Sequence, residues 1–211
     1  VKGAFTVAGF AVRPAGWRSL FARSARDYAD AMLPLAAAWG EVAERLWVES
    51  DAAADDDAIV AAMEYAIAAQ LNRIGHFQPD AQMATFAAIA RVDSTIRIDD
   101  AAARIGLSVR QLERRCLATF GLSPKTVLRR SRFLDMAMAM RGFSSPSQEE
   151  LAALRYFDQS HLTREFKRFA GMTPRAFQHT ETPLFTAGLN LRSQAASLFT
   201  PDLNPADEAP V

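Results

Sequence analysis

Two stretches of the sequence decide the fold: LERRCLATFGLSPK at residues 112–125 and LTREFKRFAGMTPR at residues 162–175. They lie 50 residues apart and align without a gap at positions that control helix geometry. The matched pairs are Leu112 with Leu162, Arg114 with Arg164, Cys116 with Phe166, Gly121 with Gly171, Ser123 with Thr173, Pro124 with Pro174, and Lys125 with Arg175. The chain therefore contains two copies of one structural unit.

Each copy predicts two helices around a tight turn. The shorter helix is expected at residues 99–105 or 148–155, and the second helix at 109–119 or 159–169. This order is that of a helix-turn-helix unit.

The expected helix ends carry capping residues. Ser108 with Gln111, and Ser147 with Glu150, have the Ser-x-x-Glu/Gln spacing of a capping box. Gly121 and Gly171 stand where a helix ends in a left-handed turn. The Ser123-Pro124 and Thr173-Pro174 pairs then predict that a further helix begins.

The second helix of each copy has an apolar and a polar face. The apolar sets are Val109, Leu112, Cys116 and Phe120 in the first copy, and Leu162, Phe166 and Phe169 in the second. The other face carries Arg110, Glu113 and Arg114, or Gln159 and Thr163. Arg pairs with guanine, Gln with adenine and Glu with cytosine in the major groove, so these residues suit base reading; a merely solvated face is the alternative.

Charge is distributed unevenly, although 24 basic and 24 acidic residues cancel overall. Residues 95–180 hold 15 basic and 8 acidic residues, a net charge of +7, whereas residues 1–94 carry −4 and residues 181–211 carry −3. A positive segment of this size favours binding of a phosphate backbone.

Residues 124–140 predict a helix between the two copies, about 25 Å long at about 1.5 Å per residue. Such a spacer suits two reading helices separated by one turn of DNA, about 34 Å. Candidate phosphate contacts are Ser108, Lys125, Arg129, Lys167, Arg168 and Arg175. Structural ion pairs are the alternative for Arg129, Lys167, Arg168 and Arg175, and for Arg130 and Arg132 on the spacer.

Residues 98–178 resemble the DNA-binding domain of the AraC/XylS family of transcription regulators. The resemblance is carried by DQSHLTREFK at residues 158–167, GMTP at 171–174, LERR at 112–115 and GLSP at 121–124. It implies a seven-helix fold with two helix-turn-helix units joined by a long helix. The base-reading positions that it implies are Arg110, Glu113, Arg114, Gln159, Ser160, Thr163 and Arg164. Duplex operator DNA is the implied partner, with RNA polymerase and a second copy of the chain as further candidates, and no cofactor is expected.

The first 94 residues predict one strand followed by helices. Residues 5–12 alternate loosely and favour a residual β-strand, the last strand of a domain cut off upstream. Apolar spacing predicts two short helices over residues 26–48, a helix at 58–73 capped by Asp57, and a helix at 80–90 that starts at Asp80. Residues 10–47 also resemble the junction that follows a β-barrel sensor in this family, so any effector pocket is expected outside the chain.

The expected fold class is therefore mainly α, with three segments. Residues 1–94 are a remnant of a sensor or dimerisation region, 95–180 the double helix-turn-helix domain, and 181–211 a C-terminal tail. Prolines and acidic residues predict partial disorder in this tail. Docking of Leu184, Phe185, Leu189 and Leu191 on the N-terminal helical segment is the alternative.

Other functional classes find little support. His76, His161 and His179 have neither metal-ligand nor nucleophile spacing, so no enzyme is expected. A helical protein-interaction adaptor is the alternative to a DNA-binding regulator. No apolar run reaches membrane-spanning length, and the single Cys116, a buried hydrophobic residue or a redox switch, fits a cytoplasmic protein.

Overall fold

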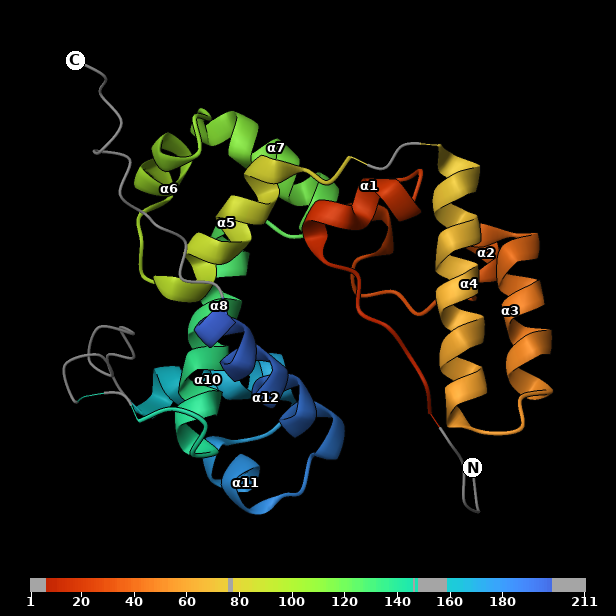
Figure 1. Ribbon diagram of the computed structural model, residues 1–211. Helices are drawn as coiled ribbons and strands as arrows, with labels where there is room; N and C mark the ends of the chain where they lie inside the picture. The colour runs from red at the N-terminus through yellow and green to blue at the C-terminus, as the bar shows by residue number, and fades with distance from the viewer. Residues whose placement is uncertain (1–6, 76–77, 146, 148–158, 199–211) are drawn as a thin grey trace. The chain divides into compact units, whose positions relative to one another are not determined.

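The computed structural model describes residues 7–75, 78–145, 147 and 159–198, and this part of the chain is helical with connecting loops (Figure 1). The N-terminal elements are η1 (Pro14–Gly16), α1 (Trp17–Leu20), η2 (Ala25–Tyr28), α2 (Ala36–Trp39), α3 (Glu41–Asp51), α4 (Asp56–Ile74) and α5 (Ala81–Val92). They are followed by α6 (Ile98–Arg104), α7 (Val109–Phe120), α8 (Pro124–Met140), α10 (Gln159–Ala170), α11 (Pro174–His179) and α12 (Pro183–Leu198). None of these helices has the length and hydropathy of a membrane span.

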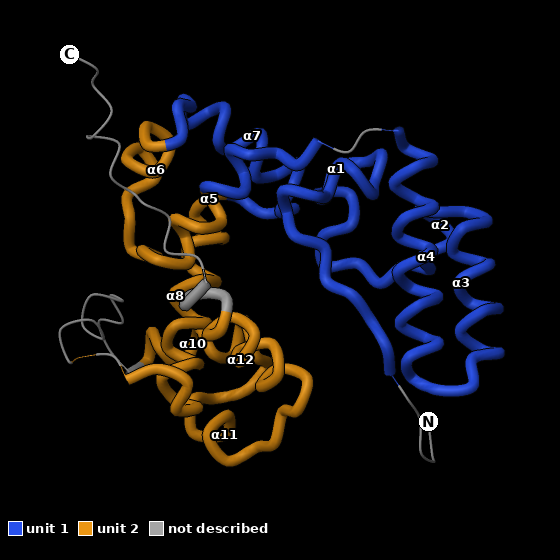
Figure 2. Tube along the Cα trace, viewed as in Figure 1, with its two compact units in different colours: residues 1–85, 105–123 blue, residues 86–104, 124–211 orange. Residues whose placement is uncertain are grey.

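The chain packs as two compact units (Figure 2). One unit combines residues 1–85 with residues 105–123, and the other combines residues 86–104 with residues 124–211. Helix α7 therefore belongs to the first unit, whereas α8, α10, α11 and α12 belong to the second. The functional division at residues 94 and 180 stays a prediction.

The first unit is built around the hairpin of α3 and α4, which lie side by side. Trp39 is 1% exposed and forms a core with Leu20, Ala43 and Ala66. The buried Gln70 of α4 donates its amide to the Leu20 carbonyl at 2.8 Å, which fixes α1 against α4.

The start of α4 differs slightly from the sequence prediction. Asp55, not Asp57, is the capping residue, and its carboxylate accepts the Ala58 amide at 2.8 Å. Asp55 has the extended backbone that a cap requires, whereas Asp57 already lies in the first turn.

The predicted residual β-strand is wrong for residues 7–12, which are the described part of it. These residues have no strand structure, because the described chain offers no second strand to hydrogen-bond with. Phe10 instead stacks on Trp39, with the two ring centroids 5.6 Å apart. The apolar residues of this segment thus contribute to a helical core.

The second unit has a core of aromatic side chains. Phe133 of α8, Phe166 of α10 and Phe177 of α11 are each at most 1% exposed. The ring centroids of Phe133 and Phe166 lie 5.0 Å apart, and those of Phe166 and Phe177 lie 5.4 Å apart. The second predicted reading helix is therefore anchored from behind by two neighbouring helices. The predicted helix at residues 148–155 lies outside the described residues.

The predicted disorder of the C-terminal tail is wrong for residues 183–198, which form α12. Leu189 is 2% exposed and, with the partly buried Phe185, joins the core of α8, α10 and α11. The alternative of docking on the N-terminal helices is also wrong for these two residues, and Leu184 and Leu191 are 78% and 66% exposed. Once Phe133 and Phe177 form an apolar surface, burial of one face of α12 outweighs the cost of ordering it.

Asp135 of α8 ties three segments of the second unit together. Its carboxylate accepts a hydrogen bond from Arg192 of α12 at 2.7 Å and one from Ser94, which follows α5, at 2.7 Å. Arg192 also donates to the Ser131 hydroxyl at 2.7 Å, and Ser131 donates to the Ala90 carbonyl at 2.5 Å. This network fixes both α5 and α12 on α8.

We predict that Arg192→Met lowers the free energy of unfolding by about 2 kcal/mol, because Asp135 is left partly buried without its cation. The midpoint of urea unfolding, followed by circular dichroism, measures the loss. Arg45→Met is the matched control, because Arg45 pairs with Glu49 on an exposed face of α3, with the arginine side chain 64% exposed. That variant should cost less than about 1 kcal/mol; equal losses in the two variants would contradict the role given to Asp135.

Candidate nucleic-acid interface

Helix α7 is closed at both ends as its sequence predicts. The Ser108 hydroxyl accepts the Gln111 amide at 3.3 Å, and the Gln111 side chain accepts the Ser108 amide at 2.8 Å, which completes the capping box. Gly121 ends the helix with φ +69°, in the left-handed region. Residues at its two ends thus cap α7, and the Ser108 hydroxyl is used in the N-terminal cap.

The outward face of α7 carries the predicted base-reading residues. Arg110, Glu113 and Arg114 are all exposed, and their spacing of three and four residues places them on one face. Val109 was expected on the packing face but is 40% exposed. It stands in the first turn, where the apolar stripe of the helix has not yet reached the core.

The inward face of α7 includes one charged residue, Arg115, to which the sequence pattern assigns no role. Leu112 and Cys116 are fully buried, and Arg115 lies between them in sequence at the edge of the same face. Its guanidinium group lies 3.1 Å from the Asp80 carboxylate and donates to the Gln82 side-chain oxygen. The signal was available, because Arg115 follows Leu112 by three residues and therefore turns toward the core side.

Helix α10 repeats this arrangement in the second unit. Ser160, Arg164, Lys167 and Arg168 are exposed, and Thr163 is half-buried. The structure describes the backbone of Gln159 as the first residue of the helix but not its side chain. Four of the residues predicted to contact DNA therefore lie on solvent-facing positions of one helix.

The buried Glu165 holds α10 from behind. Glu165 is 4% exposed, and the Arg129 guanidinium from α8 donates two hydrogen bonds to its carboxylate. Burial opposes ionisation, but the hydrogen bonds and the charge of Arg129 outweigh it, so the pKa of Glu165 lies below its ordinary value. Of the two roles left open for Arg129, the structure provides the ion pair.

The remaining candidate phosphate contacts stand at helix starts. Lys125 and Arg175 are exposed and each follows the proline that begins α8 or α11. Thr173 caps α11 by accepting the Ala176 amide at 3.1 Å. Helix N-termini offer free amides and a positive dipole end, so these cations stand where an anion would be favoured.

Several of these cations have no internal counter-charge. Arg110, Arg114, Lys125, Arg164, Lys167 and Arg175 make no ion pair with any residue that the structure describes. In contrast, Arg115 and Arg129 are both paired with carboxylates. The two sets separate by position, since the paired arginines face inward and the others face solvent.

Cys116 is a packing residue of α7. Its side chain is fully buried, and burial together with the negative charge of Asp80 raises the pKa of the thiol to about 12. The thiolate is the reactive form of cysteine, so this environment favours the buried-hydrophobe interpretation over the redox switch.

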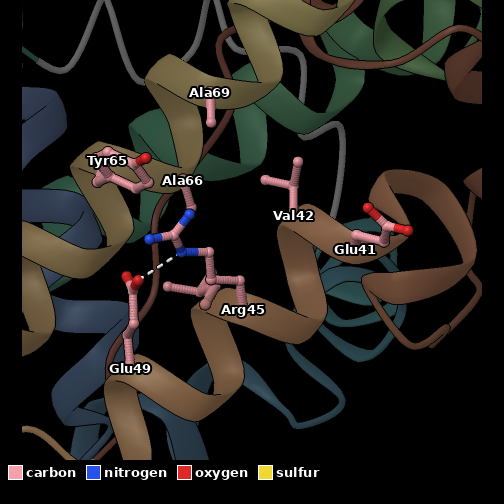
Figure 3. A pocket seen from close by; sticks show the side chains of 8 residues that line it. Glu41, Val42, Arg45, Glu49, Tyr65, Ala66 and Ala69 are labelled. Carbon is pink, nitrogen blue, oxygen red and sulfur yellow. Dashed lines mark hydrogen bonds and ion pairs between the residues drawn. The ribbon is translucent and has the colours of Figure 1, made fainter.

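A small pocket between α3 and α4 is lined by side chains that bond to one another (Figure 3). Arg45 donates to Glu49 at 2.7 Å, and its guanidinium carbon lies 5.1 Å from the centroid of the Tyr65 ring. These two interactions satisfy the only cation among the residues that line the pocket. The candidate DNA-contacting cations that pair with no described carboxylate lie on α7 and α10 and at the starts of α8 and α11, outside this pocket.

We predict that Glu165→Gln costs about 3 kcal/mol of unfolding free energy at pH 7, because Arg129 loses its partner in a partly buried site. The folded-state pKa of Glu165 is lowered. The Glu165–Arg129 pair therefore makes its full contribution to the free energy of unfolding at pH values above the unfolded pKa of about 4.3. This contribution is lost as the pH falls through the folded-state pKa. The difference between the wild-type and variant urea midpoints should therefore be constant from pH 7 to about 5 and shrink below that.

The exposed Glu64→Gln is the control, with a small effect at every pH. A wild-type advantage over Glu165→Gln that grew on acidification would contradict the assigned direction of the pKa shift.

The comparisons with known proteins agree with this geometry. Residues 101–180 match a family model described as a helix-turn-helix domain, which is of the AraC type. No curated protein and no solved structure matches the chain. The match covers α7, α8, α10 and α11, the elements that carry the paired repeat and the exposed cations. Residues 101–180 are therefore an AraC/XylS-type helix-turn-helix domain, which binds DNA in the regulation of transcription.

Proposed function

We propose that the chain reads a specific operator by placing α7 and α10 in consecutive major grooves of duplex DNA. One observation carries this proposal: the equivalent helices α7 and α10 of an internal repeat each expose one face whose cations make no ion pair with a described residue, while buried side chains hold the opposite face. A helix held in this way presents its polar face to a partner at little cost in conformational entropy.

The connection between the two helices supports the same reading. Helix α8 has 17 residues and so spans about 25 Å at about 1.5 Å per residue. Two reading helices on one face of B-DNA need to lie about 34 Å apart. A helix of this length, with the further turns at its ends, is a suitable spacer between successive grooves.

The residues divide into two roles in this proposal. Base edges are read by Arg110, Glu113 and Arg114 from α7 and by Gln159, Ser160, Thr163 and Arg164 from α10. The phosphate backbone is contacted by Ser108, through the helix terminus that it caps, and by Lys125, Lys167, Arg168 and Arg175. Arg129 supports α10 through Glu165 instead of contacting phosphate directly.

A homodimer and a contact with RNA polymerase stay predictions. The α3–α4 hairpin exposes the large apolar side chains of Trp47, Val48, Val60 and Tyr65, of which Trp47 is 74% exposed, and exposed apolar surface of this kind can serve as an interaction site. Sedimentation of the wild-type chain and of Trp47→Ser tests self-association through this hairpin, with dimers expected only for the wild type.

The proposed function is tested by fluorescence anisotropy with a duplex from beside the chain's own gene and with a scrambled duplex, at salt concentrations from about 50 to 200 mM. A sequence-specific regulator binds the first duplex more tightly and loses affinity steeply as salt rises. Absence of salt-dependent binding to both duplexes would favour the adaptor alternative.

We predict that Arg114→Ala weakens binding to the preferred duplex by about 1–3 kcal/mol and relaxes the base preference at one position. Arg45→Ala, which removes the same charge from α3, should leave the affinity unchanged. If Arg114→Ala instead weakens binding to every duplex equally, Arg114 contacts phosphate rather than a base.

We predict a different signature for Lys167→Ala. Affinity should fall by a similar factor for preferred and scrambled duplexes, and the slope of log affinity against log salt should become shallower by about 1. An unchanged slope would exclude Lys167 as a phosphate contact.

A further inference from the structure

We propose that Asp80, Gln82 and Ser24 are positioning residues for the first reading helix, so that the DNA-reading unit extends beyond residues 101–180. This inference rests on the proposed function and adds to it the residues that aim α7. All of the contacts that carry it lie within the first compact unit.

The C-terminal end of α7 is seated on η2. The Ser24 hydroxyl donates to the Leu117 carbonyl at 3.3 Å. A Cβ atom added at Gly121 would lie 2.8 Å from the Ala25 carbonyl oxygen, closer than real Cβ atoms approach. The backbone of η2 therefore lies directly against the turn that ends the helix.

The middle of α7 is held by the beginning of α5. Arg115 is paired with Asp80 and donates to Gln82, and Gln82 donates in turn to the Ile105 carbonyl at 2.8 Å. Gln82 thus links α7 to the segment that enters the helix-turn-helix turn.

Asp80 is itself fixed on both sides. Its backbone amide donates to the Ala15 carbonyl of η1 at 2.8 Å, and its carboxylate accepts the Met83 amide at 3.1 Å as the cap of α5. The Asp80 side chain is only 14% exposed. The contacts of Asp80 with η1 and α5 therefore fix its carboxylate independently of its pairing with Arg115 of α7.

These contacts control the rotation of α7 about its own axis. Arg114 and Arg115 are adjacent on α7. The contacts that Arg115 makes with Asp80 and Gln82 on the inward face therefore fix the direction in which Arg114 points on the outward face. On a helix about 10–12 Å in diameter, a rotation of about 20° moves a side-chain tip by about 2 Å. Hydrogen bonds to base edges tolerate only a few tenths of an ångström, so this hold determines specificity.

The inference is tested with Asp80→Asn, which keeps the shape of the side chain and removes its charge. Asp99→Asn is the matched control, because Asp99 pairs with Arg97 on an exposed site with both side chains more than half exposed. The DNA probe is a duplex selected from a random pool by the wild-type chain, together with two derivatives in which either half of the selected sequence is scrambled.

Asp80→Asn should bind the selected duplex about tenfold more weakly than the wild type does. The two proteins should bind equally well to the derivative whose first half, the part read by α7, is scrambled. The tenfold difference should persist on the derivative whose second half is scrambled. Asp99→Asn should follow the wild type on all three duplexes, and Ser24→Ala should show a smaller loss with the same pattern.

Cys116 provides a second measurement that needs no DNA, because it is the only cysteine of the chain and lies buried on α7. A thiol reagent reaches it only when α7 leaves its seat. Asp80→Asn should raise the labelling rate about tenfold at unchanged secondary structure, and Asp99→Asn should not.

Wild-type labelling and wild-type affinity in Asp80→Asn would overturn the inference. Equal losses on both half-scrambled derivatives would overturn it too, because they indicate general destabilisation rather than a changed aim of α7. If the wild-type chain selects no sequence from the pool, the proposed function itself fails, and the positioning role falls with it even if labelling responds. A third outcome rejects only the positioning role. In it, the wild type selects a sequence and Asp80→Asn raises the labelling rate of Cys116, but the variant shows no loss of affinity specific to the half read by α7.

Discussion

The structure depends on one constraint. A helix that reads DNA must leave its outer face exposed to solvent, so the contacts that fix its position must all lie on its inner face and at its ends. Helices α7 and α10, the proposed reading helices, each carry a charged residue on the inner edge that meets this constraint. Arg115 of α7 pairs with Asp80, and Glu165 of α10 pairs with Arg129. Residues 115 and 165 are equivalent positions of the 50-residue repeat, occupied by opposite charges. Such a pair adds little net stability, because desolvation offsets much of its attraction, but removal of one partner leaves the other charge unpaired in a partly buried site and is costly.

Most of the domain could be predicted from the sequence because its determinants are local. The capping box of Ser108 and Gln111, the left-handed turn at Gly121 and the cap at Thr173 each involve residues within a few positions of one another, and all three were expected. The pairing of Arg115 with Asp80 could not be predicted, because it joins residues 35 positions apart. Helical spacing from Leu112 does place Arg115 on the inner side, but it does not indicate which carboxylate it meets. The assignment of individual residues to base edges or phosphates stays a prediction.

The two predictions of the fold that are wrong share a physical cause. Local pattern predicts a strand that includes residues 7–12 and partial disorder in a tail that includes residues 183–198, whereas the outcome in these two segments depends on which surface lies nearby. Phe10 packs on Trp39 because no neighbouring strand is available in the described chain. Leu189 orders α12 because the aromatic core of α8, α10 and α11 offers it an apolar surface. Pro183, one of the prolines from which the sequence predicts disorder, is instead the first residue of α12, a position where proline is favoured.

Gly121 and Gly171, which follow α7 and α10, show how the two copies of the repeat differ. Both have positive φ, +69° at Gly121 and +71° at Gly171, but among the described residues a backbone atom lies close to the place of a Cβ at Gly121 and none does at Gly171. At Gly171 no described residue apart from its chain neighbours lies within 4 Å of the place of a Cβ, so asparagine, which adopts the left-handed conformation more readily than most other residues, fits this environment. At Gly121 every side chain is excluded. Tolerance of substitution is therefore unequal at these two equivalent positions, because the backbone of η2 lies against Gly121 and no described residue beyond the chain neighbours lies as close to Gly171.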